Sequence, residues 1–126
     1  MNTSKLVTDV YSRKFLDESL KLDPKIRLVA IYDGLFRGKF REGIKRYFED
    51  EEIKSSLSEV QDRWNLRKNM SFNAGEPKFA MAQYGSVNRI TIPNGDDGII
   101  LMTTEIDVDV NTLVDKVIET RIRFLD

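Results

Sequence analysis

The chain has 126 residues and a mass of 14.6 kDa, which is the size of a single domain. Its 20 Lys and Arg nearly balance 21 Asp and Glu, so bulk charge argues against a strongly basic nucleic-acid binder. The absence of Cys and His excludes disulfides, thiol nucleophiles and the commonest general base and metal ligand. We therefore expect one soluble globular domain over residues 1–126. Enzyme chemistry would have to rest on Asp, Glu, Lys or Tyr, and the sequence marks out no pair of carboxylates that would share a pocket, so we expect no catalytic activity and no cofactor.

The N-terminal half predicts a helix followed by a β-hairpin. Apolar residues at spacings of three and four predict a helix over residues 4–22, which ends before Pro24 because the residue preceding proline disfavours helical backbone. Residues 26–43 predict the hairpin, with a buried first strand and a two-residue turn at Asp33-Gly34. In its second strand, side chains alternate between Phe36, Gly38 and Phe40 on one face and Arg37, Lys39 and Arg41 on the other.

The C-terminal half predicts a helix over residues 50–68, three strands and a last helix. The predicted strands cover about residues 78–84, 87–92 and 99–104, and the helix covers residues 110–125, with Asp109 or Asn111 as its cap. The segments 73–77 and 93–98 are expected to be loops. The resulting order, α-β-β-α-β-β-β-α, is that of an α+β domain in which helices cover a five-stranded antiparallel sheet.

The order of elements and residues 23–34 (DPKIRLVAIYDG) resemble the roadblock/dynein-light-chain family, within the profilin-like and longin-like folds. The glycines at 34, 38 and 43 are also similar to those of short, uncharacterised archaeal proteins. The resemblance implies the sheet order 2-1-5-4-3 with helices on both faces, and a homodimer in which the second helix and third strand pair across a two-fold axis. Members of this family are mostly non-catalytic scaffolds or regulators of Ras-like GTPases and motors, an implication that rests on fold analogy.

The helix predicted over residues 50–68 carries an apolar stripe with a single tryptophan. A stripe of this kind usually packs on the helix's own sheet, but aromatic residues are also enriched at interfaces. Because the resemblance places this helix at a dimer contact, we expect these residues and two from the third strand to lie at or beside the contact between two copies. The expected interface residues are Ile53, Leu57, Val60, Trp64, Phe79 and Met81.

The basic side of the second strand, Arg37, Lys39 and Arg41, has three interpretations. Charged side chains on an edge strand deter aggregation between sheets, which is the simplest one. The same three residues are also the candidate surface for an acidic protein partner such as a small GTPase. Contact with nucleic acid is the weakest of the three because the net charge of the whole chain is only -1.

Two motifs resemble ligand-binding loops but depart from them. Residues 34–39 (GLFRGK) have one residue too few between the glycines for a phosphate-binding loop, and Phe40 stands where Ser or Thr is required. The alternation of Asp107, Asp109 and Asn111 begins like a calcium loop but lacks its glycine and its final glutamate. We interpret this second segment as a solvated strand end leading into a helix cap. The sequence leaves open whether the acidic residues Asp96, Asp97, Asp107 and Asp109 bind a cation.

These observations predict a non-enzymatic, homodimeric interaction module, with a small Ras-like GTPase as the kind of partner that the resemblance implies. The first alternative is a small-molecule sensor with a pocket between the sheet and a helix. The second is a nucleic-acid binder that uses the basic strand, whose affinity would fall steeply with salt. Because no signal-peptide segment begins the chain and no apolar run could cross a bilayer, we expect a cytoplasmic protein without membrane contact.

Overall fold

Five antiparallel strands form one sheet in the order β2-β1-β5-β4-β3 in the computed structural model, which describes residues 3–95 and 98–125. This is the predicted sheet order, and the predicted sequence of helices and strands is also confirmed. The strands are β1 (Ile26–Tyr32), β2 (Phe36–Phe40), β3 (Ala80–Gln83), β4 (Asn88–Asn94) and β5 (Gly98–Thr104).

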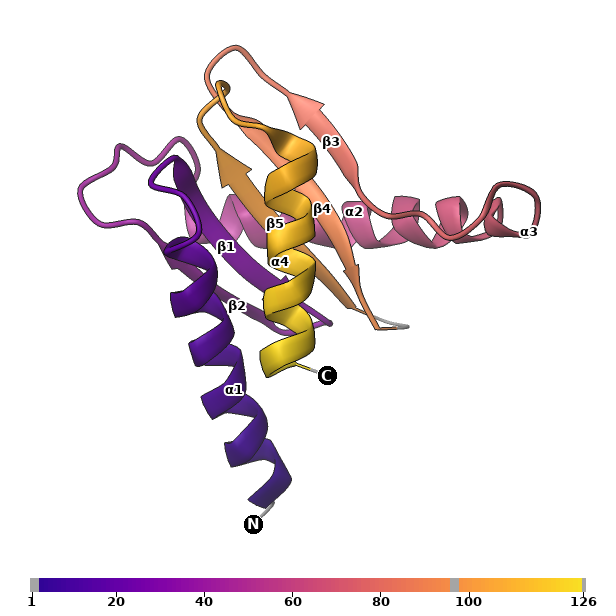
Figure 1. The fold of residues 1–126 in the computed structure, drawn as a ribbon, viewed down its shortest axis with the longest axis horizontal. Helices are drawn as coiled ribbons and strands as arrows, with labels where there is room; N and C mark the ends of the chain where they lie inside the picture. The colour runs from indigo at the N-terminus through magenta and orange to yellow at the C-terminus, as the bar shows by residue number, and fades with distance from the viewer. Residues whose placement is uncertain (1–2, 96–97, 126) are drawn as a thin grey trace.

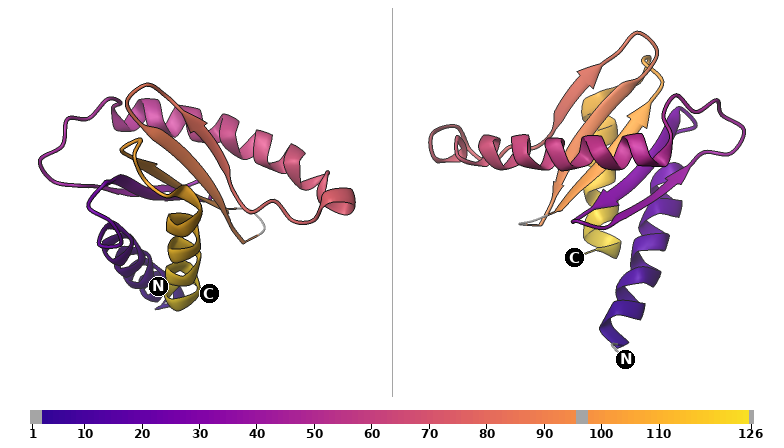
Figure 2. Two further views of the ribbon diagram at one scale, coloured as in Figure 1. Left: turned by 45° about the horizontal axis from the view of Figure 1, so that its top comes forward. Right: turned by 180° about the vertical axis from the view of Figure 1, so that it is seen from behind.

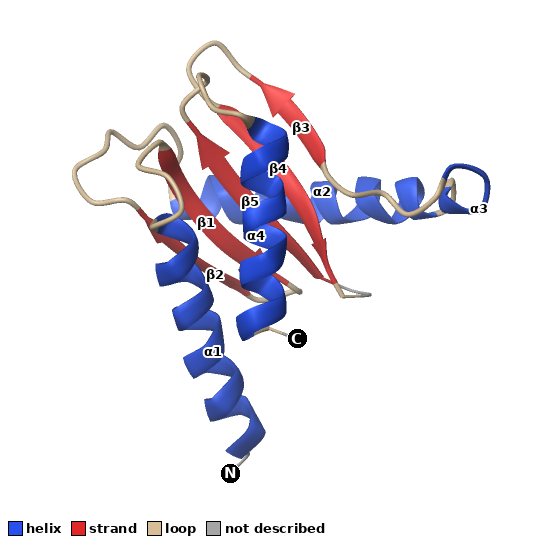
Figure 3. Ribbon diagram, in the orientation of Figure 1, coloured by secondary structure: helices blue, strands red, loops and turns tan. Residues whose placement is uncertain are grey.

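Helices cover both faces of the sheet, as predicted. On one face lie α1 (Thr3–Leu20) and α4 (Val110–Phe124), side by side, whereas α2 (Asp50–Lys68) crosses the opposite face (Figures 1 and 2). A single additional turn of helix, α3 (Ser71–Ala74), follows α2 (Figure 3). The domain therefore has three layers, with the sheet in the middle.

Strands β1 and β5 lie at the centre of the sheet and are buried on both faces. Their side chains alternate between two apolar clusters, one under α1 and α4 and the other under α2. Val29, Ile31, Ile100 and Met102 belong to the first cluster, and Leu28, Ala30, Ile99 and Leu101 belong to the second. Continuous apolar strands of this kind can only be stable with helices on both sides.

An irregularity in β1 changes the direction of the side chains at its beginning. The register between β1 and β5 shifts between Ile26 and Leu28, which interrupts the strict alternation. As a result, Ile26 and Val29 pack in the same cluster, while Arg27 and Leu28 both line a hollow on the α2 face. Sequence periodicity did not reveal this bulge.

Several element ends differ from the predicted ones for local reasons. The segment predicted as a loop over residues 73–77 begins inside α3, where the N–H groups of Asn73 and Ala74 donate to the Met70 carbonyl. Strand β4 continues through Pro93, which pairs with Ile99 of β5. The proline is tolerated there because the ladder between β3 and β4 starts at the Ala80–Thr91 pair, so its other side faces no strand.

Leucines on the two sides of α2 provide a test of this packing. Leu57 is fully buried, so replacing it with alanine leaves a cavity and should lower the free energy of unfolding by about 2–5 kcal/mol. Leu66 on the same helix is 66% exposed, so Leu66→Ala should change it by less than about 0.5 kcal/mol. Urea unfolding of both variants measures the difference, and equal effects would contradict the orientation of α2.

Candidate functional site

The apolar stripe of α2 packs on the chain's own sheet. Ile53, Leu57, Val60 and Trp64 are all buried, and they form one cluster with the β1 and β5 side chains on that face. Trp64 has no exposed surface. Within one chain, these four residues therefore belong to the core, which is the simpler of the two interpretations that the sequence allowed.

The two remaining expected interface residues lie elsewhere. Phe79 packs against the cluster under α1 and α4, on the opposite face of the sheet from Trp64. Met81 is 46% exposed on β3, which is an edge strand. The structure thus divides the six residues between the core, the opposite face and the sheet edge. That they lie at or beside a contact between two copies stays a prediction.

The C-terminal end of α2 extends past the β3 edge of the sheet (Figures 1 and 2). Its buried stripe ends at Trp64, and beyond that point Leu66 and Met70 are about two-thirds exposed. Strand β3 beside it pairs with β4 on one side only. Exposed apolar side chains and an open strand edge therefore occur together at this end of the molecule, a combination typical of association surfaces.

The basic residues of β2, Arg37 and Lys39, and Arg41 directly after the strand are engaged within the chain. Arg37 forms an ion pair with Asp33 at 3.0 Å, and Lys39 forms one with Asp17 of α1. Arg41 donates to the carbonyl oxygens of Ile26, Leu20 and Asp23 at 2.5–2.9 Å and so joins the end of β2 to the end of α1. A partner or nucleic acid that binds these three side chains would have to compete with these contacts.

The acidic segment before α4 has two structural roles. Asp109 caps α4 by accepting hydrogen bonds from the Thr112 backbone N–H at 3.2 Å and the Thr112 hydroxyl at 2.9 Å, as the sequence predicts for a cap. These bonds lower the pKa of the Asp109 carboxyl. Asp107 pairs with Lys25 at 2.8 Å, and the hydrogen bond lowers the pKa of Asp107 and raises that of Lys25.

Among the side chains that the structure describes, no group of three or more acidic residues could hold a metal ion. Asp96 and Asp97, which the sequence left as candidate cation ligands, lie outside the described residues. Across residues 3–95 and 98–125, no helix has the length and apolar character needed to cross a membrane.

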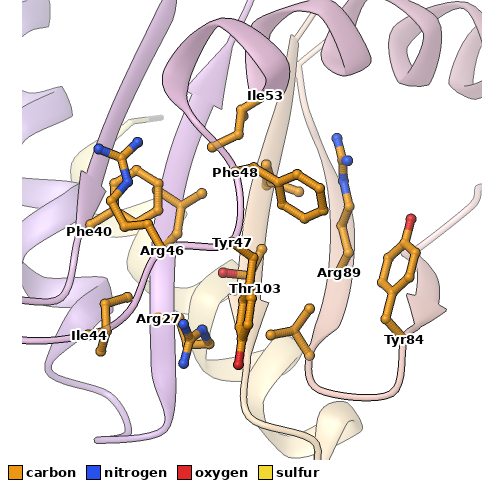
Figure 4. Close-up of a pocket in the computed structure, with 13 residues that line it drawn as sticks. Arg27, Phe40, Ile44, Arg46, Tyr47, Phe48, Ile53, Tyr84, Arg89 and Thr103 are labelled. Atoms are coloured by element: carbon orange, nitrogen blue, oxygen red, sulfur yellow. The ribbon is translucent and has the colours of Figure 1, made fainter.

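A narrow hollow lies on the α2 face of the sheet, beneath the segment that joins β2 to α2 (Figure 4). Its volume is about 40 Å³, which suffices for about two or three water molecules but not for an organic ligand. Arg27 there pairs with Glu105 at 2.7 Å and stacks on Tyr47, and Arg46 pairs with Asp50 and stacks on Phe40. A small-molecule sensor would need a larger pocket between the sheet and a helix than this narrow hollow provides.

Sequence reasoning missed this hollow because its walls come from distant parts of the chain. The only local signal was a charged residue inside an otherwise apolar strand, such as Arg27 in β1 or Arg89 in β4. Arg27 is 8% exposed, and its position depends on the bulge in β1. Arg89 lines the same hollow and donates to the Ser56 hydroxyl of α2 at 2.6 Å.

Comparison with solved structures shows that the chain has the roadblock/LC7 fold. It superposes on a roadblock/LC7 domain from Streptomyces avermitilis with a TM-score of 0.65 and 9% identity, covering 89% of this chain and 95% of that one. A gliding protein, MglB from Thermus thermophilus, gives a TM-score of 0.70 and 11% identity, covering 93% of this chain and 90% of that one. A structure described as MglB with a tetrameric arrangement gives a TM-score of 0.64 and 7% identity, and the superposition covers 90% of this chain and 90% of that one.

No protein-family model matches the sequence, and no curated protein matches it either. At identities of 7–11%, the similarity establishes the fold and leaves the function to the chain's own surfaces. The resemblance to archaeal proteins stays a prediction.

A pair of substitutions tests whether the basic residues in and directly after β2 serve the fold. Arg41→Ala removes three charge-assisted hydrogen bonds to carbonyls and should lower the free energy of unfolding by about 2 kcal/mol. Lys39→Ala removes one half-exposed ion pair and should cost at most about 1 kcal/mol. Thermal or urea unfolding compares the two, and a stable Arg41→Ala variant would mean that this residue is available to a partner.

Proposed function

We propose that this protein is a non-enzymatic, homodimeric interaction module that serves as a scaffold or regulator of a small Ras-like GTPase. The proposal is supported by the roadblock fold and by the similarity to MglB, one structure of which is described as having a tetrameric arrangement. A cytoplasmic location belongs to the same proposal.

The main support for self-association is that the two edge strands of the sheet, β2 and β3, differ in charge and in how far they are covered. Strand β2 has charged side chains and lies against α1, to which Lys39 is paired. Strand β3, Ala-Met-Ala-Gln, has no charged residue and is open beside the projecting end of α2. An uncharged open edge is a template for pairing with another strand, whereas charged or covered edges resist it. We therefore place the contact between two copies at β3 and the exposed end of α2.

The hydrogen-bond pattern of β3 indicates which backbone groups such a contact would use. The Tyr84 N–H donates to the Val87 carbonyl at 2.8 Å, and bonded pairs alternate along an antiparallel ladder. Ala82 and Ala80 are therefore bonded to β4, while the N–H of Met81 points to the open edge. A proline at position 81 removes an outward donor and leaves the ladder with β4 in place.

Light scattering after size-exclusion chromatography tests the dimer. We expect the wild type to have about twice the 14.6 kDa mass of the chain and Met81→Pro to raise the dissociation constant of the dimer at least about tenfold, because a cross-strand hydrogen bond is lost. Met81→Ala keeps the N–H and is the matched control. A monomeric wild type would refute self-association, and an unaffected Met81→Pro dimer would place the contact elsewhere.

Binding to small GTPases tests the second half of the proposal. Small Ras-like GTPases from the protein's own proteome are immobilised with GDP or with a non-hydrolysable GTP analogue, and the purified protein is passed over them. A regulator that responds to the nucleotide state should bind one form at least about tenfold more tightly, equivalent to about 1.4 kcal/mol. Absence of binding to every GTPase in both forms would refute this partner class, whatever the oligomeric state.

A further inference from the structure

A groove separates the C-terminal half of α2 from the edge strand β3 and its neighbour β4, on the same face as the narrow hollow. Its volume is about 220 Å³, more than five times that of the hollow. Small side chains on β3, Ala80 and Ala82, leave this space open below the helix. The other lining residues are Val60, Arg63, Arg67, Met81, Tyr84, Arg89 and Thr91. Three guanidinium groups therefore share one groove, and no Asp or Glu is in its lining.

The three arginines lack the acidic partner that many other cations of the domain have. Five cations each pair with a carboxylate from another part of the chain or an adjacent turn, namely Lys25, Arg27, Lys39, Arg46 and Lys78. Within the described ranges, no ion pair involves Arg63, Arg67 or Arg89. This holds even for Arg63 and Glu59, which lie one helical turn apart.

Arg89 is held in the groove without its charge being neutralised. The Arg89 guanidinium donates a hydrogen bond to the Ser56 hydroxyl at 2.6 Å, and that hydroxyl donates its own proton to the Ile53 carbonyl. The Arg89 Nε atom is buried and has no acceptor among the described residues. Burial lowers the pKa of Arg89, the nearby Tyr84 opposes this shift, and the positive charge of Arg63 adds to it. Figure 4 shows Arg89 beside Tyr84, with its guanidinium directed toward α2.

The helix dipole alone does not account for this cluster. Arg67 and Lys68 in the last turn of α2 stabilise the negative end of the helix, as basic residues commonly do. Arg89, however, belongs to β4 and lies in the interior of the sheet rather than in the helix. Leaving a half-buried guanidinium beside a second one costs free energy, which a bound anion would recover.

We propose that this groove is a binding site for a phosphate group, held by Arg63, Arg67 and Arg89. A phosphate presents three acceptor oxygens and about two negative charges, so it can engage several guanidinium groups at once. A single carboxylate presents two oxygens and one charge, which one arginine satisfies. Tyr84 and Thr91 add hydroxyl donors to the lining. The groove is the size of one such group with its waters rather than of a long segment of chain.

Calorimetric titration with inorganic pyrophosphate tests the site in the full chain at low ionic strength, with acetate as the singly charged comparison. We expect saturable binding of pyrophosphate, at least about tenfold tighter than that of acetate, and at least about tenfold weaker in the Arg63→Gln/Arg67→Gln double variant. Arg89→Gln should have a similar effect. Because Arg89 is half-buried, the exposed double variant keeps the test valid if Arg89→Gln does not fold.

Arg46→Gln is the matched control because it removes one positive charge at the neighbouring hollow, outside the groove. It should leave pyrophosphate binding within about twofold of the wild type, since Arg46 already has Asp50 as its partner. Titration with a nucleoside diphosphate in parallel shows whether the site takes a phosphate group carried by a larger molecule or the inorganic ion alone.

Three results would overturn the proposal. The first is no saturable binding of pyrophosphate, and the second is equal weakening by Arg46→Gln, which would indicate bulk charge. The third is loss of self-association in the Arg63→Gln/Arg67→Gln variant with no change in pyrophosphate binding. That result would assign the arginines to carboxylates of a second copy. Phosphate binding by a chain that proves monomeric would support the site and refute only the dimer.

Discussion

The pairing of β1 with β5 is the constraint on which the rest of the domain depends. Both strands are apolar on both faces, so neither face can be left to water, and two separate helical layers are required. Helices α1 and α4 fill one side, and α2 alone fills the other. The bulge in β1 then places Arg27 on the α2 face, where Glu105 neutralises it. Arg27 therefore lines the narrow hollow because of the bulge in β1, where this strand pairs with β5.

Using a single helix on one face gives the molecule two unlike ends. Near β2, the sheet edge is closed by charged side chains that bind α1, and Arg41 fixes the end of that helix. Near β3, α2 continues beyond the sheet, and its apolar stripe gives way to Arg67 and Lys68 after Trp64. The edge strand there is short and uncharged. The proposed contact between two copies and the proposed phosphate site therefore lie at the same end, where the backbone donors of β3 are unpaired on one side and three guanidinium groups lack a carboxylate partner among the described residues.

The proposed function depends on that end of the molecule, since the comparisons establish the fold alone. The roadblock fold occurs in the structural neighbours at identities so low that no individual surface residue can be transferred from them. A contact between two copies at β3 would bring two arginine grooves close to one another. Phosphate bound in them would then reduce the repulsion between like charges, so ligand binding and self-association would be coupled in this arrangement.

The sequence by itself determined the elements and several of their ends. The stripe from Ile53 to Trp64 identified α2, and Asp109 marked the cap of α4. Asp33-Gly34 marked the position of the first turn, but the predicted length of two residues was wrong, because Tyr32 pairs with Phe36 and the loop has three residues. These signals are local, since periods, caps and turns involve residues a few positions apart. The sheet order came from the family resemblance, because periodicity does not say which strands become neighbours.

Only the tertiary structure decided which side chains from distant positions meet. It separated Phe79 from Trp64 and paired Lys39 with Asp17. It also left Arg63, Arg67 and Arg89 together in a groove without a carboxylate. The physical reason is that charge pairing and packing depend on which elements become neighbours in space, and no local pattern in the chain records that choice.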